Sequence, residues 1–177
     1  MRVLVTYSSK HGATAGIAGR IGDTLRAAGL DVEVWPAAEV DDIEGYDAVV
    51  AGSAVYLGSW LKDVTGFLRH NASALVTRPV WLFSSGPVGH PPEHAEGDDV
   101  SKAVSAKQRA ELRDLAQPRD HHVFFGAVDR STFGVAEHLF AATPAGRKLL
   151  PEGDFRDWAE IEAWAADIAA ELTTVPA

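Results

Sequence analysis

The segment YSSKHGATAG, residues 7–16, stands between a short apolar run and the first amphipathic run of the chain. It brings small hydroxyl side chains, a glycine and a basic side chain into one loop. The N-terminus of a helix presents unpaired N–H groups and the positive end of the helix dipole, which suit an anion such as phosphate. Ser9 and Thr14 can add hydroxyl donors, and Gly12 allows close backbone approach. The segment therefore predicts an anion-binding turn, with a hydroxyl-rich helix cap as the simpler alternative.

The loop matches neither of two common phosphate-binding motifs. The Gly-Lys-Ser/Thr of a P-loop is absent, and so is GxGxxG after the first strand. A receiver domain has the same five-strand topology, but it needs an acidic pair after the first strand and an aspartate after the third. The chain has Ser8, Ser9 and Ser53 at those places, and these residues cannot form a magnesium site.

Short apolar runs alternate with amphipathic runs along the chain. The pattern predicts strands over residues 2–7, 30–36, 46–54, 79–86 and 121–128, and helices over residues 13–29, 60–75, 101–116 and 154–172. Such alternation is typical of an α/β fold, here a doubly wound five-stranded parallel sheet with helices on both faces. We expect a single domain over residues 1–177.

The composition narrows the classes of function. The 177 residues carry a net charge of -9, which argues against sequence-independent nucleic-acid binding. There is no cysteine, so disulfides, thiolate nucleophiles and iron–sulfur ligation are excluded, and any redox chemistry must come from an organic cofactor. No apolar run approaches the ~20 residues of a membrane span, and no signal peptide is visible. The expected location is the cytoplasm.

The carboxyl ends of parallel strands meet at one edge of a sheet, where ligands bind in open α/β folds. Serine and glycine follow the first, third and fourth predicted strands, which makes one site from three loops. Tyr56, beside Gly58, can stack on a flat aromatic ligand, whereas Trp60 is expected in the core. The candidate cofactor-binding residues are Ser8, Ser9, Lys10, His11, Gly12, Ala13, Thr14, Ser53, Ala54, Val55, Tyr56, Leu57, Gly58, Ser84, Ser85, Gly86, Pro87, Val88 and Gly89.

YSSKHGAT followed by an amphipathic helix resembles the phosphate loop of the flavodoxin superfamily, and GSAVYLG and FSSGPVG are similar to its two isoalloxazine-binding loops. The resemblance covers nearly the whole chain. It is closest to the branch that contains menaquinone-dependent protoporphyrinogen oxidase, which shares the Ser-Ser/Thr-x-x-Gly-x-Thr loop, a long segment after the fifth strand and an Asp-Trp pair, here Asp157-Trp158. The resemblance implies a flavodoxin-like sheet of order 2-1-3-4-5 and an FMN whose 5′-phosphate lies at the first loop.

The same resemblance implies an FMN-dependent oxidoreductase, similar to protoporphyrinogen oxidase or to quinone reductases. Its electron partners would be a quinone, a porphyrinogen or a redox protein. A non-catalytic electron carrier and a binding module that has lost its flavin remain alternatives. The chain departs from the superfamily at His11, where a threonine is usual, and in residues 129–153, which hold Arg130, Arg147 and Lys148 but no tyrosine.

Two long segments lie outside the predicted elements. Residues 89–99 gather histidine and acidic side chains but no regular element that would fix a metal, so we expect a solvated loop and no metal site. Residues 129–153 include a short stretch with helical spacing, from Phe133 to Phe140. We expect this second segment to wall a pocket over the flavin, with peripheral membrane contact through its basic residues. Packing on the side of the domain, or a subunit contact in a homodimer, is the alternative.

Overall fold

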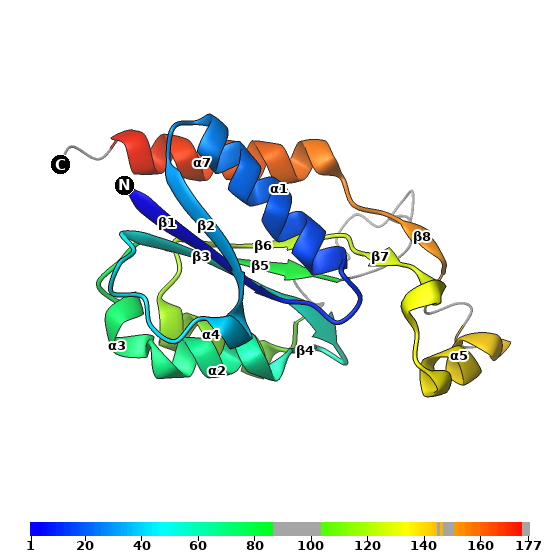
Figure 1. Ribbon diagram of the computed structural model, residues 1–177. Helices are drawn as coiled ribbons and strands as arrows, with labels where there is room; N and C mark the ends of the chain where they lie inside the picture. The colour runs from blue at the N-terminus through cyan, green and yellow to red at the C-terminus, as the bar shows by residue number, and fades with distance from the viewer. Residues whose placement is uncertain (87–103, 145, 147–150, 175–177) are drawn as a thin grey trace.

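The computed structural model describes residues 1–86, 104–144, 146 and 151–174. Five parallel strands form its central sheet in the order β2-β1-β3-β5-β6 (Figure 1). Their bounds are Asp31–Pro36 for β2, Arg2–Ser8 for β1, Ala48–Tyr56 for β3, Val80–Ser85 for β5 and Asp120–Phe124 for β6. This order confirms the predicted doubly wound, flavodoxin-like sheet.

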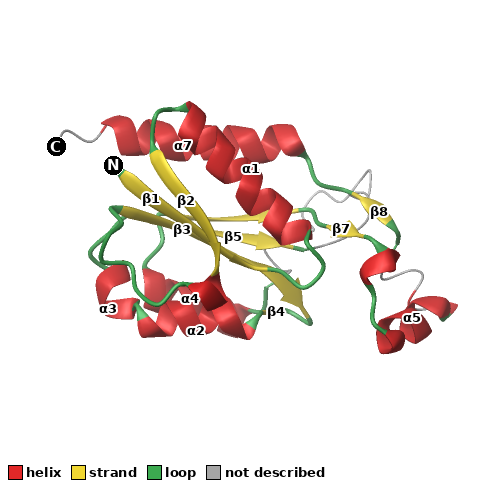
Figure 2. Cartoon of the chain, in the orientation of Figure 1, coloured by secondary structure: helices red, strands yellow, loops and turns green. Residues whose placement is uncertain are grey.

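Helices cover both faces of the sheet (Figure 2). One face carries α1 and α7, and the other carries α2, α3 and α4. Their bounds are Ala13–Ala27 for α1, Lys62–His70 for α2, Ala72–Leu75 for α3, Ala106–Ala116 for α4 and Trp158–Thr174 for α7. A 3-10 turn, Ala37–Glu39, follows β2.

The side chains of β1 alternate between two apolar clusters. Val3 and Val5 pack with α1 and α7, whereas Leu4 packs with α2 and α4. Because both faces are covered, all three side chains are fully buried, as expected of a central parallel strand. The core therefore consists of two layers that hold the carboxyl ends of the strands in fixed register.

The predicted helix over residues 60–75 is wrong at its start and at its middle. Ser59–Trp60 forms β4, which pairs antiparallel with the end of β3, so Trp60 is not helical. Trp60 is nevertheless buried, as expected. The helix divides at Asn71, whose side-chain amide donates to the Phe67 carbonyl (3.1 Å) and so ends α2 before α3 begins.

The ends of the last predicted elements also differ. The strand expected over residues 121–128 is two strands, β6 and β7 (Ala127–Val128). The last helix begins at Trp158 and not at residue 154, because the Asp157 carboxylate caps it by accepting from the N–H groups of Ala159 (3.0 Å) and Glu160 (3.1 Å).

Residues 129–152 leave the sheet as one excursion and return beside their starting point. The excursion begins with a 3-10 turn, Arg130–Thr132, and continues into α5, Val135–Ala142, which confirms the predicted short helix. Its root is closed by β7 and β8 (Gly153–Asp154), which pair antiparallel. In Figure 1, α5 lies to one side of the sheet, beyond the carboxyl ends of the strands. None of the helices in the described ranges is long and apolar enough to cross a membrane.

Candidate functional site at the carboxyl ends of β1, β3 and β5

The three strands that lead into the predicted loops end next to one another. In the sheet register Ser8 is paired with Ser53, and Ser53 with Ser84, so the three strands end side by side. Residues 9–12, 57–58 and 86 continue from these ends. Three of the predicted binding residues, Pro87, Val88 and Gly89, lie outside the described residues.

The first loop turns directly into α1. Gly12, with φ 85°, is the N-cap residue of α1, and no side chain caps this helix. The Gly12 N–H donates to the Ser9 hydroxyl (3.0 Å), which closes the turn. The first backbone bond of the helix runs from Gly16 N–H to Gly12 C=O (3.0 Å). The N–H groups of the first turn, at Ala13 and Thr14, therefore have no partner further back in the helix.

The hydroxyls of Ser8 and Ser53 are bonded inside the protein. Ser8 donates to the Asp63 carboxylate of α2 (3.2 Å). The Ser53 hydroxyl accepts from the Leu61 N–H (2.9 Å) and donates to the Ala54 carbonyl (2.8 Å). These hydroxyls stabilise the connection from the sheet to α2, and the loop beyond them supplies the surface of the site.

Ser84 belongs to a buried polar chain. Its hydroxyl accepts from the Trp60 indole N–H (2.8 Å) and lies 2.9 Å from Nε2 of His121. Burial lowers the pKa of His121 to about 4. The sequence predicted Trp60 in the core but did not reveal its hydrogen bond to Ser84.

The second loop is a tight hairpin turn between β3 and β4. Leu57 and Gly58 both have positive φ, 50° and 74°, as the central residues of a type I′ turn do. Such a φ is uncommon for leucine, and the Leu57 side chain is fully exposed. The Ser105 N–H at the start of α4 donates to the Gly58 carbonyl (2.8 Å) and holds the turn.

Tyr56 lies between this hairpin and the first loop. The Lys10 ammonium group is 5.6 Å from the centre of its ring. Burial raises the pKa of Tyr56, and the negative charge of Glu137 adds to the effect. Tyr56 keeps 39% of its surface exposed, so its ring remains open to a ligand at this edge.

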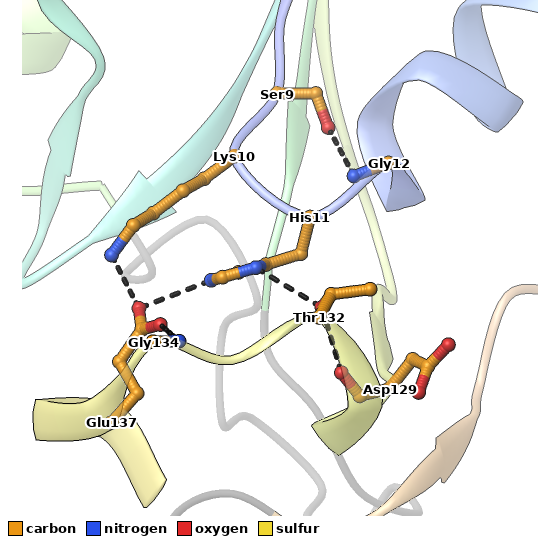
Figure 3. Close-up of polar contacts among 8 residues, drawn as sticks. All are labelled: Ser9, Lys10, His11, Gly12, Asp129, Thr132, Gly134 and Glu137. Atoms are coloured by element: carbon orange, nitrogen blue, oxygen red, sulfur yellow. Dashed lines mark hydrogen bonds and ion pairs between the residues drawn. The ribbon is translucent and has the colours of Figure 1, made fainter.

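The excursion contacts the first loop through side chains that the sequence did not identify (Figure 3). Oε1 of Glu137, on α5, accepts from the Lys10 ammonium group and lies 3.1 Å from Nε2 of His11. Oε2 of Glu137 accepts from the Gly134 N–H (2.9 Å). The bonds from Lys10 first, and from Gly134 second, lower the pKa of Glu137 to about 2. The helical spacing predicted α5, but it carried no sign of partners more than 120 residues away.

His11 is held on its other side as well. Its Nδ1 lies 3.1 Å from the Thr132 hydroxyl, and its ring is 5.4 Å from that of Phe133. The excursion thus contacts the first loop at Lys10 and at both ring nitrogens of His11. Beyond β8, the Arg156 guanidinium donates to the Ala13 carbonyl in the first turn of α1 (3.3 Å).

A family model for the flavodoxin domain matches residues 4–143, which include the first loop, the hairpin turn and α5. The chain belongs to the flavodoxin domain family. Membership implies a flavin cofactor.

Comparison with individual proteins agrees with the family. The chain is 26% identical over 186 residues to protoporphyrinogen IX dehydrogenase (quinone) of Escherichia coli K12, and the match covers 99% of this chain and 98% of that protein. Flavodoxin 1 of Bacillus cereus superimposes with a TM-score of 0.59 at 12% identity, over 99% of this chain and 100% of that one. Rubredoxin oxygen:oxidoreductase of Desulfovibrio gigas superimposes with a TM-score of 0.61 at 16% identity, over 97% of this chain and 36% of that one. At these identities the structural likeness shows the fold alone.

The acidic and histidine-rich loop at residues 89–99 lies outside the described residues. Within the described ranges, no three His, Cys, Asp or Glu side chains are grouped so that they could hold a metal ion.

Proposed function

We propose that this chain binds FMN at the carboxyl ends of β1, β3 and β5 and acts as an FMN-dependent oxidoreductase that uses a quinone. The observation that carries the proposal is the uncapped N-terminus of α1, held beside the ends of β3 and β5 in a chain of the flavodoxin domain family. When bound, FMN supplies the redox chemistry through its isoalloxazine ring, and the protein supplies position and electrostatics.

The residues of the first loop fit a phosphate. The first-turn N–H groups of α1 point out of the helix end, and the positive φ of Gly12 turns the backbone around them. Thr14 adds a buried hydroxyl to the same turn, and Ser9 fixes the shape of the turn through Gly12. Ser9, Gly12, Ala13 and Thr14 would hold the phosphate at the end of α1.

The second and third loops fit a flat ring. Tyr56 offers an exposed aromatic face, and the turn beside it is narrow because Gly58 has no side chain. A Cβ added to Gly86 would stand 3.2 Å from Cβ of Val55, so the backbone of Gly86 lies close to the end of β3. Backbone groups of this kind suit hydrogen bonding to the edge of a heterocycle.

Two observations support a quinone as the redox partner: the name of the E. coli relative and the position of the excursion. The E. coli protein is named for a porphyrinogen and a quinone, and it matches this chain from end to end. A much shorter connection could join β7 to β8, so the fold itself does not need the excursion. The excursion nevertheless contacts the first loop, beside the proposed flavin. We propose that it borders the acceptor site, with a quinone as acceptor and a porphyrinogen as the candidate donor.

A flavodoxin-type electron carrier is the second candidate. The net charge of -9 favours it, because an acidic surface is typical of small redox carriers that meet a basic partner. The two candidates share the flavin site and differ in whether the excursion serves a substrate.

A replacement of the excursion separates the two candidates. Because β7 and β8 pair at its root, residues 131–150 can be exchanged for a short Gly/Ser linker without pulling the sheet apart. For the oxidoreductase, FMN binding and ferricyanide reduction persist while quinone reduction collapses. If quinone reduction also survives unchanged, the excursion is not the acceptor site and the carrier is favoured. A wild-type chain that shows no flavin spectrum after incubation with FMN would overturn both candidates.

A further inference from the structure

Both basic side chains of the first loop are already paired in this structure. Lys10 and His11 converge on the same carboxylate oxygen, Oε1 of Glu137 (Figure 3). The other oxygen of Glu137 accepts from Gly134 at the start of α5. One side chain of the excursion therefore occupies both basic side chains of the first loop, which precedes the proposed phosphate site.

The ring of His11 is held between the excursion and the first loop. Its Nε2 lies 3.1 Å from Oε1 of Glu137, the oxygen that also accepts from Lys10. Its Nδ1 lies 3.1 Å from the hydroxyl of Thr132, which donates to the Asp129 carbonyl (2.7 Å). Glu137 thus offsets the positive charge of Lys10 and contacts His11 through the same oxygen.

Among the described residues, polar contacts hold α5 more than apolar packing does. Val135 and Leu139 are 81% and 68% exposed, and Phe140 is 46% exposed. Of the large apolar side chains near this contact, the Phe133 ring is the one placed against His11. A helix held in this way can be released when its polar partners are taken by a stronger anion.

We propose that Glu137 is a specificity-determining residue that competes with the phosphate of the flavin for Lys10 and His11. This inference rests on the proposed FMN site. A phosphate dianion at the first loop repels the Glu137 carboxylate and attracts the Lys10 ammonium group and the N–H of His11, so its binding releases α5 from the loop. Riboflavin has no phosphate and leaves the contact intact. The loop thereby couples the presence of the phosphate to the position of the excursion.

Flavin titrations of Glu137→Gln test the competition. Glutamine keeps the shape of the side chain and can still accept from Gly134, but it removes the charge. We expect FMN to bind about tenfold more tightly to E137Q than to the wild type, with riboflavin affinity unchanged. The matched control is Glu160→Gln on α7. The Glu160 carboxylate lies 3.0 Å from Nε2 of His122, so this variant removes the charge from another carboxylate–histidine pair. E160Q should leave both affinities unchanged.

Hydrogen exchange of the α5 amides supplies a readout that does not depend on activity. In the wild type, FMN should speed exchange in residues 138–142, and riboflavin should not. An unchanged or smaller ratio of FMN to riboflavin affinity in E137Q contradicts the proposal. So does a gain in FMN affinity that survives both Lys10→Gln and His11→Gln in the E137Q background. If the wild type binds neither flavin while E137Q alone speeds exchange in α5, the contact is real, but the proposed function and the competition both fall.

Discussion

The central sheet and the excursion bury their apolar side chains to very different degrees. Leu68 on α2 is fully buried, whereas Leu139 on α5 is 68% exposed. The sheet is stabilised by two apolar clusters, and the described part of the excursion by a few hydrogen bonds and ion pairs. Apolar burial contributes most of the stability of a fold, whereas exposed ion pairs contribute little but are easily exchanged. The difference separates a core held by apolar burial from a segment whose described contacts are mainly polar and exposed.

The same substitution in both regions gives the largest expected contrast. Leu68→Ala should lower the free energy of unfolding by about 2–5 kcal/mol, because it leaves a cavity in a fully buried site. Leu139→Ala should change it by less than about 0.5 kcal/mol. Urea denaturation followed by far-UV circular dichroism measures both values. A large loss in the Leu139 variant would mean that α5 is part of the cooperative core.

Acid should weaken the core through His121. Its pKa in the folded state is about 4, below the ordinary value of 6.5, because the ring is buried beside Ser84 and Trp60. The unfolded chain therefore binds a proton that the folded chain excludes, and stability falls as pH drops from about 6.5 towards 4. The loss is of the order of 3 kcal/mol at most.

The pH effect is checked by measuring the unfolding free energy between pH 7 and pH 4 for the wild type and for His121→Gln. The difference between the two proteins should shrink as pH falls, since the variant has no such proton to exclude. A difference that stays constant over this range would show that the ring of His121 is not titrating as its burial requires.

Substitutions of two threonines compare the first turn of α1 with the excursion in their effect on flavin affinity. Thr14→Ala, in the first turn of α1, should weaken FMN by about 1.5–3 kcal/mol more than riboflavin, because a hydroxyl bond to a charged phosphate is lost. Thr132→Ala, in the excursion, should not weaken FMN. Fluorescence titration with both flavins gives the four affinities. Equal losses of FMN and riboflavin in the Thr14 variant would place the phosphate elsewhere.

The smallest expected effect concerns two aromatic rings of similar exposure. Tyr56→Ala should lower flavin affinity and reduce the quenching of flavin fluorescence, with about 0.5–1.5 kcal/mol from the lost stacking. Phe140→Ala on α5, where the ring is 46% exposed, should change neither quantity. If the two variants behave alike, Tyr56 is not a neighbour of the flavin.

The sheet could be predicted from the sequence because its signals are local and repeated. The alternation of Val3, Leu4 and Val5 places side chains on both faces, and the stripe from Ile17 to Leu25 covers one of them. The ends of helices and strands were harder to predict, because they depend on single contacts such as the capping of α7 by Asp157.

The candidate site could be predicted only as a set of loops. The register that joins Ser8, Ser53 and Ser84 follows from the order of the strands. The sequence did not reveal that these serines bond to other groups of the protein, because a hydroxyl can hydrogen-bond to a ligand or to the backbone equally well. The pairing of Glu137 with Lys10 joins elements that no pattern of spacing connects, so it became visible only in three dimensions.

The pairing of β7 with β8 has a consequence for how the chain can change in length. Ala127 lies opposite Asp154 and Val128 opposite Gly153, so the chain leaves and re-enters the core at neighbouring points. Lengthening such a closed loop costs little, about 0.6 kcal/mol for each doubling. Insertions and deletions between these strands can accumulate without moving the sheet, and a foreign peptide or a small folded module can be grafted there.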